Sequence, residues 1–111
     1  MKVQDISSFE HHASIVHRGI VLVEYYVSWC SPCRAQASII DGVADDLNGK
    51  ASVARLNLDR SRNAAEALRI RSVPTLVVFI NGMEVRRFIG LQSRETLTAC
   101  LAEVIAGVRA P

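Results

Sequence analysis

Cysteine, histidine and long apolar runs are all scarce in this chain of 111 residues. It has three cysteines and three histidines, and nowhere do 18 apolar residues follow one another. A membrane-spanning helix needs about 20 such residues in succession, so we expect no membrane segment. Residues 1–6 also lack the long apolar stretch of a secretory signal peptide. We therefore expect the protein to work in the cytoplasm.

A strong excess of charge of one sign is absent too. Lysine and arginine number 13 against 11 acidic residues, which leaves a formal net charge of +2. So small an excess argues against a general role on nucleic acid or on a membrane surface. Half of the residues are hydrophobic, enough for a sizeable core, and the length predicts a single domain over residues 1–111.

The sequence has too few ligands for a metal centre. Cys30 and Cys33 have the Cys-x-x-Cys spacing of half a zinc site, but a full site needs two more ligands. The only other cysteine is Cys100, and the histidines crowd residues 11–17 without ligand spacing. We therefore expect no metal.

A static structural disulfide is a second alternative for the role of the Cys30 and Cys33 pair, although a bridge over so short a loop removes little chain entropy.

The two cysteines stand where a strand gives way to a helix. Residues 20–27 form a short apolar run rich in β-branched and aromatic side chains, which predicts a buried strand. A helical pattern follows the cysteines. Free backbone N–H groups in the first helical turn favour a thiolate, so Cys30 should lose its proton easily. Cys33 falls on the same face, within reach of a disulfide, and Pro32 suits a first turn.

Periodicity and turn residues predict the remaining elements. Further strands are expected at residues 3–6, 51–59, 75–80 and 84–89, with a hairpin at Asn81-Gly82 between the last two. Further helices are expected after Ser7 or Ser8, at residues 63–68, and after Ser93. This order predicts an α/β fold, in which a mixed sheet has helices on both faces.

Two helices carry specific expectations about burial. The apolar stripe of the first should consist of Phe9, Ala13 and Val16, and Cys100 should lie in the core beneath the last helix. We expect the three histidines of the first segment on the surface: His11, His12 and His17.

One segment of the chain resembles a known family. Residues 23–34, Val-Glu-Tyr-Tyr-Val-Ser-Trp-Cys-Ser-Pro-Cys-Arg, are similar to the active-site segment of thioredoxins. The likeness continues at residues 53–59, at residues 70–76, at Asn81-Gly82 and at Gly90, in the family's order and spacing. It implies the thioredoxin fold, with the cysteine pair at the carboxyl end of a central strand.

The resemblance also implies the chemistry. A thioredoxin-like protein is a thiol-disulfide oxidoreductase that reduces protein disulfides, with Cys30 as the nucleophile and Cys33 as the resolving thiol. Glu24 stands where thioredoxins carry a buried aspartate, and an acid inside an apolar strand should have a raised pKa. We expect Glu24 to be the base that deprotonates Cys33. The alternatives are that Glu24 points to solvent or pairs with Arg55.

The same resemblance suggests a docking surface around the cysteines. Val73-Pro74 is similar to the family's cis-proline loop, which would offer its backbone to an extended substrate; an ordinary trans turn is the alternative. Trp29 would belong to an apolar rim, unless it is plain core. The expected substrate-binding residues are Trp29, Ser31, Pro32, Val73, Pro74, Gly90 and Leu91.

Partners and competing functions follow from this resemblance. We expect a monomer without a cofactor that acts on disulfide-containing proteins and is recharged by an enzyme of the thioredoxin-reductase type. One alternative is a dedicated redox partner or oxidant for a single target. Another, from a different class, is a binding subunit whose thiols are vestigial. Intact Cys30, Pro32, Cys33 and Pro74 argue against the last.

Overall fold

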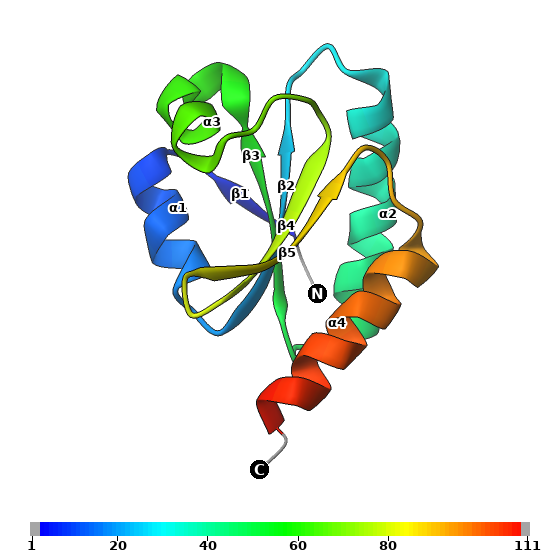
Figure 1. Cartoon of the computed structure of the whole chain (residues 1–111). Coiled ribbons are helices and arrows are strands. Elements are labelled where there is room, and N and C mark those ends of the chain that lie inside the picture. The colour runs from blue at the N-terminus through cyan, green and yellow to red at the C-terminus, as the bar shows by residue number, and fades with distance from the viewer. Residues whose placement is uncertain (1–2, 110–111) are drawn as a thin grey trace.

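The computed structural model of the protein describes residues 3–109, and a β-sheet runs through the middle of them (Figure 1). The strands are β1 (Gln4–Ile6), β2 (Ile20–Tyr26), β3 (Ser52–Asn57), β4 (Thr75–Ile80) and β5 (Met83–Ile89). The helices are α1 (Phe9–Val16), α2 (Ser31–Leu47), α3 (Arg62–Leu68) and α4 (Arg94–Arg109). The predicted order is confirmed. The strand expected at residues 51–59 ends early, because a 3₁₀ turn, η1 (Leu58–Arg60), follows it.

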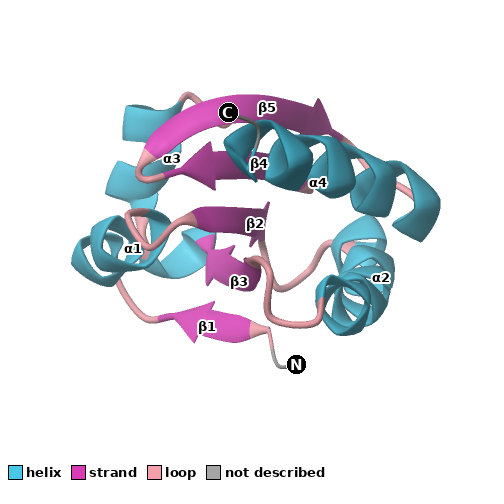
Figure 2. Cartoon of the chain, turned by 90° about the horizontal axis from the view of Figure 1, so that it is seen from below, coloured by secondary structure: helices cyan, strands magenta, loops and turns pink. Residues whose placement is uncertain are grey.

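Strand β2 occupies the centre of the sheet. The strand order is β1-β3-β2-β4-β5, in which β3 pairs parallel with both β1 and β2. Strand β4 pairs antiparallel with β2, and β5 pairs antiparallel with β4. This is the mixed sheet that the element order predicted. Viewed from below, the strands lie between α1 and α3 on one side and α2 and α4 on the other (Figure 2).

Alternation along β2 divides the core into two layers. Successive side chains of a strand point to opposite faces of the sheet. Val21, Val23 and Tyr25 belong to the cluster beneath α1 and α3. Ile20 and Leu22 belong to the cluster beneath α2 and α4, together with Ile40 and Leu101 of those helices. Cys100, expected in the core, is half-buried and packs against this second cluster.

The buried stripe of α1 differs from the predicted one. His12 is 3% exposed, and its Nε2 lies 2.6 Å from the Tyr25 hydroxyl. The expectation that His12 lies on the surface was wrong, because this hydroxyl satisfies a ring nitrogen that burial would otherwise leave unpaired. Burial also lowers the pKa of His12 to about 4. Ala13, one position on, is exposed instead. His17 is exposed as expected, and His11 is half-buried.

Local signals set the limits of several elements. Ser8 caps α1 by accepting from His11 N at 3.0 Å, and Ser93 Oγ accepts from Thr96 N at the start of α4. Asn48 ends α2 in the left-handed conformation, with a φ of 48°. The hairpin between β4 and β5 turns through Asn81 (φ 50°) and Gly82 (φ 87°), both left-handed as a tight hairpin turn requires.

Two findings concern what residues 3–109 do not contain. Among these residues, no helix combines the length and the hydrophobicity that a membrane span requires. Nor do they bring together three or more His, Cys, Asp or Glu side chains that could hold a metal ion.

Candidate redox site at the carboxyl end of the central strand

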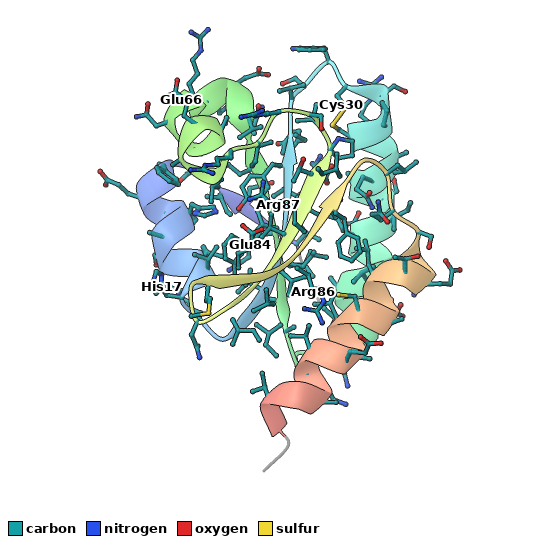
Figure 3. The ribbon with its side chains drawn as sticks, in the orientation of Figure 1. His17, Cys30, Glu66, Glu84, Arg86 and Arg87 are labelled. Carbon is teal, nitrogen blue, oxygen red and sulfur yellow. A yellow bond between two sulfur atoms is a disulfide. The ribbon has the colours of Figure 1, made fainter. Side chains whose placement is uncertain are left out.

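The cysteine pair forms a disulfide at the start of α2. Cys30 is the N-cap of this helix, and it is bonded to Cys33 across a Cα–Cα distance of 5.2 Å. The Cys33 N–H donates a hydrogen bond to Cys30 Sγ at 3.2 Å. Cys30 is 7% exposed and Cys33 is 1% exposed. Figure 3 shows Cys30 at the end of α2 nearest the loop from β2. The sequence placed both residues correctly.

The position of Cys30 at the helix start affects the charge of its sulfur in the reduced protein. A helix N-terminus presents unpaired N–H groups and the positive end of the helix dipole. Both stabilise a negative charge on Cys30 Sγ once the disulfide opens. Cys33 is the donor rather than the acceptor of this contact, and its side chain is almost inaccessible. The geometry therefore favours Cys30 as the sulfur that meets an outside disulfide.

A polar network holds the loop between β2 and the disulfide. Ser28 donates from both its N and its Oγ to Asp59 Oδ2, each at 3.2 Å. Asn57 Nδ2 donates to Ser28 Oγ at 3.2 Å, and Arg34 Nη1 donates to Ser28 O at 3.4 Å. Most of these contacts join residues about thirty positions apart, so local sequence patterns do not predict them. They fix the backbone that leads into Cys30.

Glu24 is buried on the face of the sheet that α2 covers. It is 0% exposed, and it follows Ile20 and Leu22 in the alternation of β2. Its Oε1 accepts from Arg55 Nε at 2.9 Å, so the pairing with Arg55 that was held as an alternative is present. The Arg55 guanidinium in turn lies 3.8 Å from the centre of the Tyr26 ring. The alternative in which Glu24 points to solvent was wrong.

Burial and pairing act on this carboxyl in opposite directions. Burial raises the pKa of Glu24 from 4.5 to about 7, although the charge and hydrogen bond of Arg55 pull the pKa down. Oε2 has no hydrogen-bond partner among residues 3–109. Burial therefore holds a proton on Glu24 to a higher pH than on an exposed glutamate, and Oε2 is the oxygen that Arg55 does not occupy.

The loop before β4 reaches the same end of the sheet. Thr75 pairs with Tyr25 of β2 and with Ile89 of β5, which places Pro74 and Gly90 next to each other. Gly90 N donates to Pro74 O at 2.8 Å. The Val73-Pro74 peptide bond is cis, as the resemblance implied, so the trans alternative was wrong.

The expected substrate-binding residues differ in exposure. Trp29 is 77% exposed and Leu91 is 50% exposed, so Trp29 is not plain core. Ser31 and Pro32 are exposed in the first turn of α2. Val73 and Gly90 are half-buried, and Pro74 is buried. Ile89, which the sequence analysis did not name, is 68% exposed at the end of β5. Its position beside the expected rim residues Gly90 and Leu91 could have pointed to it.

Gln36 is a second residue that sequence reasoning missed. It is fully buried in α2, one turn after Cys33. Its Oε1 accepts from Gln92 N at 2.7 Å, and its Nε2 donates to Gln92 O at 3.0 Å. A glutamine among apolar residues of a helix was the available signal.

Comparisons with known proteins agree with this geometry. A family model described as Thioredoxin matches residues 2–103. A thioredoxin of Chlamydia pneumoniae is 37% identical over 93 residues, which is 84% of this chain and 90% of that protein. A thioredoxin of Staphylococcus haemolyticus is 34% identical over 101 residues, 91% of this chain and 93% of that protein.

Solved structures show the same architecture. A mutant thioredoxin from Halobacterium salinarum superposes with a TM-score of 0.85 at 26% identity, covering 92% of this chain and 89% of that one. A chloroplastic thioredoxin z superposes with a TM-score of 0.84, covering 96% of both chains. At 24% identity the second match supports the fold alone.

Proposed function

This chain belongs to the thioredoxin family and is a thiol-disulfide oxidoreductase, and we propose that it reduces protein disulfides through Cys30 as nucleophile and Cys33 as resolving thiol. The observation that supports these roles is the difference between the two sulfurs. Cys30 caps α2, accepts the N–H of Cys33 and is the more exposed of the pair.

The reaction proceeds in two exchanges. The Cys30 thiolate attacks one sulfur of a substrate disulfide, which forms a mixed disulfide and releases the other substrate sulfur as a thiolate. The Cys33 thiol then loses its proton and attacks Cys30 Sγ. This step closes the Cys30–Cys33 disulfide and releases the second substrate sulfur. The substrate gains two electrons and the enzyme loses two.

Glu24 is our proposed acceptor for the Cys33 proton. Cys33 needs a base to remove its proton, because its side chain is buried and its own backbone N–H donates to Cys30 Sγ rather than to its own sulfur. The Glu24 carboxyl lies on the α2 side of the sheet, and its pKa of about 7 suits proton exchange near neutral pH. The unpartnered Oε2 can accept a proton directly or through one water molecule.

The docking surface comprises the exposed side chains around the disulfide and the backbone of the cis-proline loop. Trp29, Ile89 and Leu91 offer apolar contact area, and Val73 lies beside the cis bond with Pro74. An extended substrate segment can add to this backbone as a strand would. Ser31 and Pro32 border the sulfurs and contact the same segment.

Thioredoxins act on disulfide substrates and are recharged by a reductase. For this chain we assign the recharging step to an enzyme of the thioredoxin-reductase type, which supplies two electrons to the Cys30–Cys33 disulfide. A reductase of this kind belongs in a reducing compartment, so we assign it to the cytoplasm. The alternative function is a dedicated oxidant for one target. Equilibration with glutathione tests it by measuring the reduction potential of the Cys30–Cys33 pair, because an oxidant would have a potential well above that of the cytosolic glutathione pool.

Cysteine substitutions test the assignment of roles. With insulin as the protein disulfide and dithiothreitol as the electron source, Cys30→Ser should abolish reduction. When reduced Cys33→Ser protein is mixed with insulin after all dithiothreitol has been removed, it should form a mixed disulfide that persists on a non-reducing gel, because no resolving thiol remains. Cys100→Ser is the matched control and should keep full activity. Normal single-turnover release by Cys33→Ser would refute the two-step mechanism.

A further inference from the structure

Gln36 occupies a place where a polar side chain is costly. Its amide is completely buried, and a buried amide without hydrogen bonds loses the free energy of its contacts with water. Here both ends of the amide bond the same residue, through Gln92 N at 2.7 Å and Gln92 O at 3.0 Å. A two-point contact of this kind fixes the orientation of Gln92 as well as its position. The pair joins α2 to a loop 56 residues away in sequence.

The segment that Gln36 holds is also attached at its other end. Gly90 N donates to Pro74 O at 2.8 Å, which joins the segment to the cis-proline loop. Leu91 lies between the two attachments and is 50% exposed, and Ile89 just before them is 68% exposed. Exposed apolar side chains on a fixed backbone are suited to contact with a partner, because little conformational entropy is lost on binding.

We propose that Gln36 is a positioning residue for substrate docking, which holds residues 90–92 so that Leu91 faces an extended apolar segment of the substrate protein. This inference rests on the proposed disulfide reduction and adds a residue to it. Gln36 makes its hydrogen bonds with Gln92 and has none with either sulfur. It therefore acts on the association with large substrates and leaves the thiol exchange itself unchanged.

Two disulfides of different size separate these effects. Reduced protein is mixed with insulin, which needs a docking surface, or with dithiobis-nitrobenzoate, which is too small to span one. Fluorescence of Trp29, the sole tryptophan, follows the second-order rate. Gln36→Met keeps the length of the side chain and removes both hydrogen bonds. Hydrogen exchange at the backbone N–H of Gln92 reports whether its hydrogen bond to Gln36 has been lost.

The expected pattern is selective. Gln36→Met should reduce insulin about tenfold more slowly, the effect of losing two ordinary hydrogen bonds, and should react with dithiobis-nitrobenzoate at the wild-type rate. The backbone N–H of Gln92 should exchange with solvent faster than in the wild type. Gln4→Met is the matched control: it makes the same substitution at an exposed glutamine of β1, outside the segment that Gln36 holds. It should behave as wild type with both disulfides.

Several outcomes would overturn the inference. Equal loss with both disulfides would place the effect of Gln36 on the thiols, and an unchanged insulin rate would remove its role altogether. Selective loss without faster Gln92 exchange would also contradict it. Gln36→Glu serves if the Met variant does not fold, since it sets a carboxylate against Gln92 O and should show the same selectivity. A wild type that reduces neither disulfide would refute the proposed function itself.

Discussion

The two oxygens of the Glu24 carboxyl lie in different surroundings. Oε1 has the Arg55 guanidinium at 2.9 Å, and Oε2 has no hydrogen-bond partner among residues 3–109. A buried oxygen without a partner costs about 1 to 3 kcal/mol, and such atoms call for an explanation in native proteins. A proton that moves between Cys33 and this oxygen would supply one.

Glu24→Gln tests this role kinetically. The variant should form the mixed disulfide at the wild-type rate, because the Cys30 thiolate is stabilised by the helix start. It should release the mixed disulfide about tenfold more slowly, because the amide cannot accept the Cys33 proton. Stopped-flow measurement of Trp29 fluorescence, with an insulin disulfide in excess, resolves the two steps.

An exposed glutamate provides the control for this substitution. Glu66 is exposed on α3, well away from Cys30 in Figure 3, and Glu66→Gln removes the same charge. Both steps should keep their wild-type rates in that variant. If Glu24→Gln slowed both steps equally, or neither, then Glu24 would be structural and water would be the base.

At the scale of single elements, two glycines occupy opposite kinds of position. Gly82 turns the hairpin between β4 and β5 with a φ of 87°, and a Cβ there would lie 2.5 Å from His17 Nε2. Gly107 is exposed in α4, and a Cβ there would meet nothing within 4 Å. The same substitution should therefore have opposite effects at the two sites.

Gly82→Ala should lower the free energy of unfolding by about 1 to 2 kcal/mol, because alanine is strained in the left-handed conformation. Gly107→Ala should raise it by about 0.5 to 1 kcal/mol, because alanine loses less entropy in a helix. Urea denaturation of the oxidised protein measures both. A Gly82→Ala variant as stable as the wild type would mean that the hairpin does not require this conformation.

At the scale of the whole molecule, two buried ionisable groups on opposite faces of the sheet have opposite effects on how stability depends on pH. The pKa of His12, beneath α1, falls to about 4, so the unfolded chain binds the extra proton between pH 4 and 6.5. Its contribution to stability thus rises with pH in that window. The pKa of Glu24, beneath α2, rises to about 7, so the folded chain binds the extra proton between pH 4.5 and 7. Its contribution falls with pH there.

The opposed slopes predict how stability depends on pH. Each group alone changes the free energy of unfolding by about 1.4 kcal/mol per pH unit, so the oxidised wild type should be nearly flat between about pH 5 and 6.5. Glu24→Gln should reveal the rise due to His12. His12→Gln, which can still bond the Tyr25 hydroxyl, should reveal the fall due to Glu24. If the free energy of unfolding changed with pH in the same way in all three proteins, this account would be contradicted.

Local patterns in the sequence are enough to predict the order of the elements and the location of the cysteine pair. Those features depend on local signals: apolar periodicity, the serine caps at Ser8 and Ser93, and the left-handed turn at Asn81-Gly82. Each acts within a few residues, so it can be read without knowledge of the rest of the fold. The roles of Cys30 and Glu24 came from the same source together with the family resemblance, and they remain predictions.

Which polar side chains are buried, and which groups they bond to, depends on how distant parts of the chain pack together. Helical periodicity favoured Ala13 for the inner face of α1, yet His12 is buried because β2 brings the Tyr25 hydroxyl to its ring. Gln36 meets Gln92 only because α2 and the loop before α4 pack together. The free energy of a buried polar group depends on its partner. These partners lie 13 and 56 residues away in sequence, a separation over which local patterns carry no information.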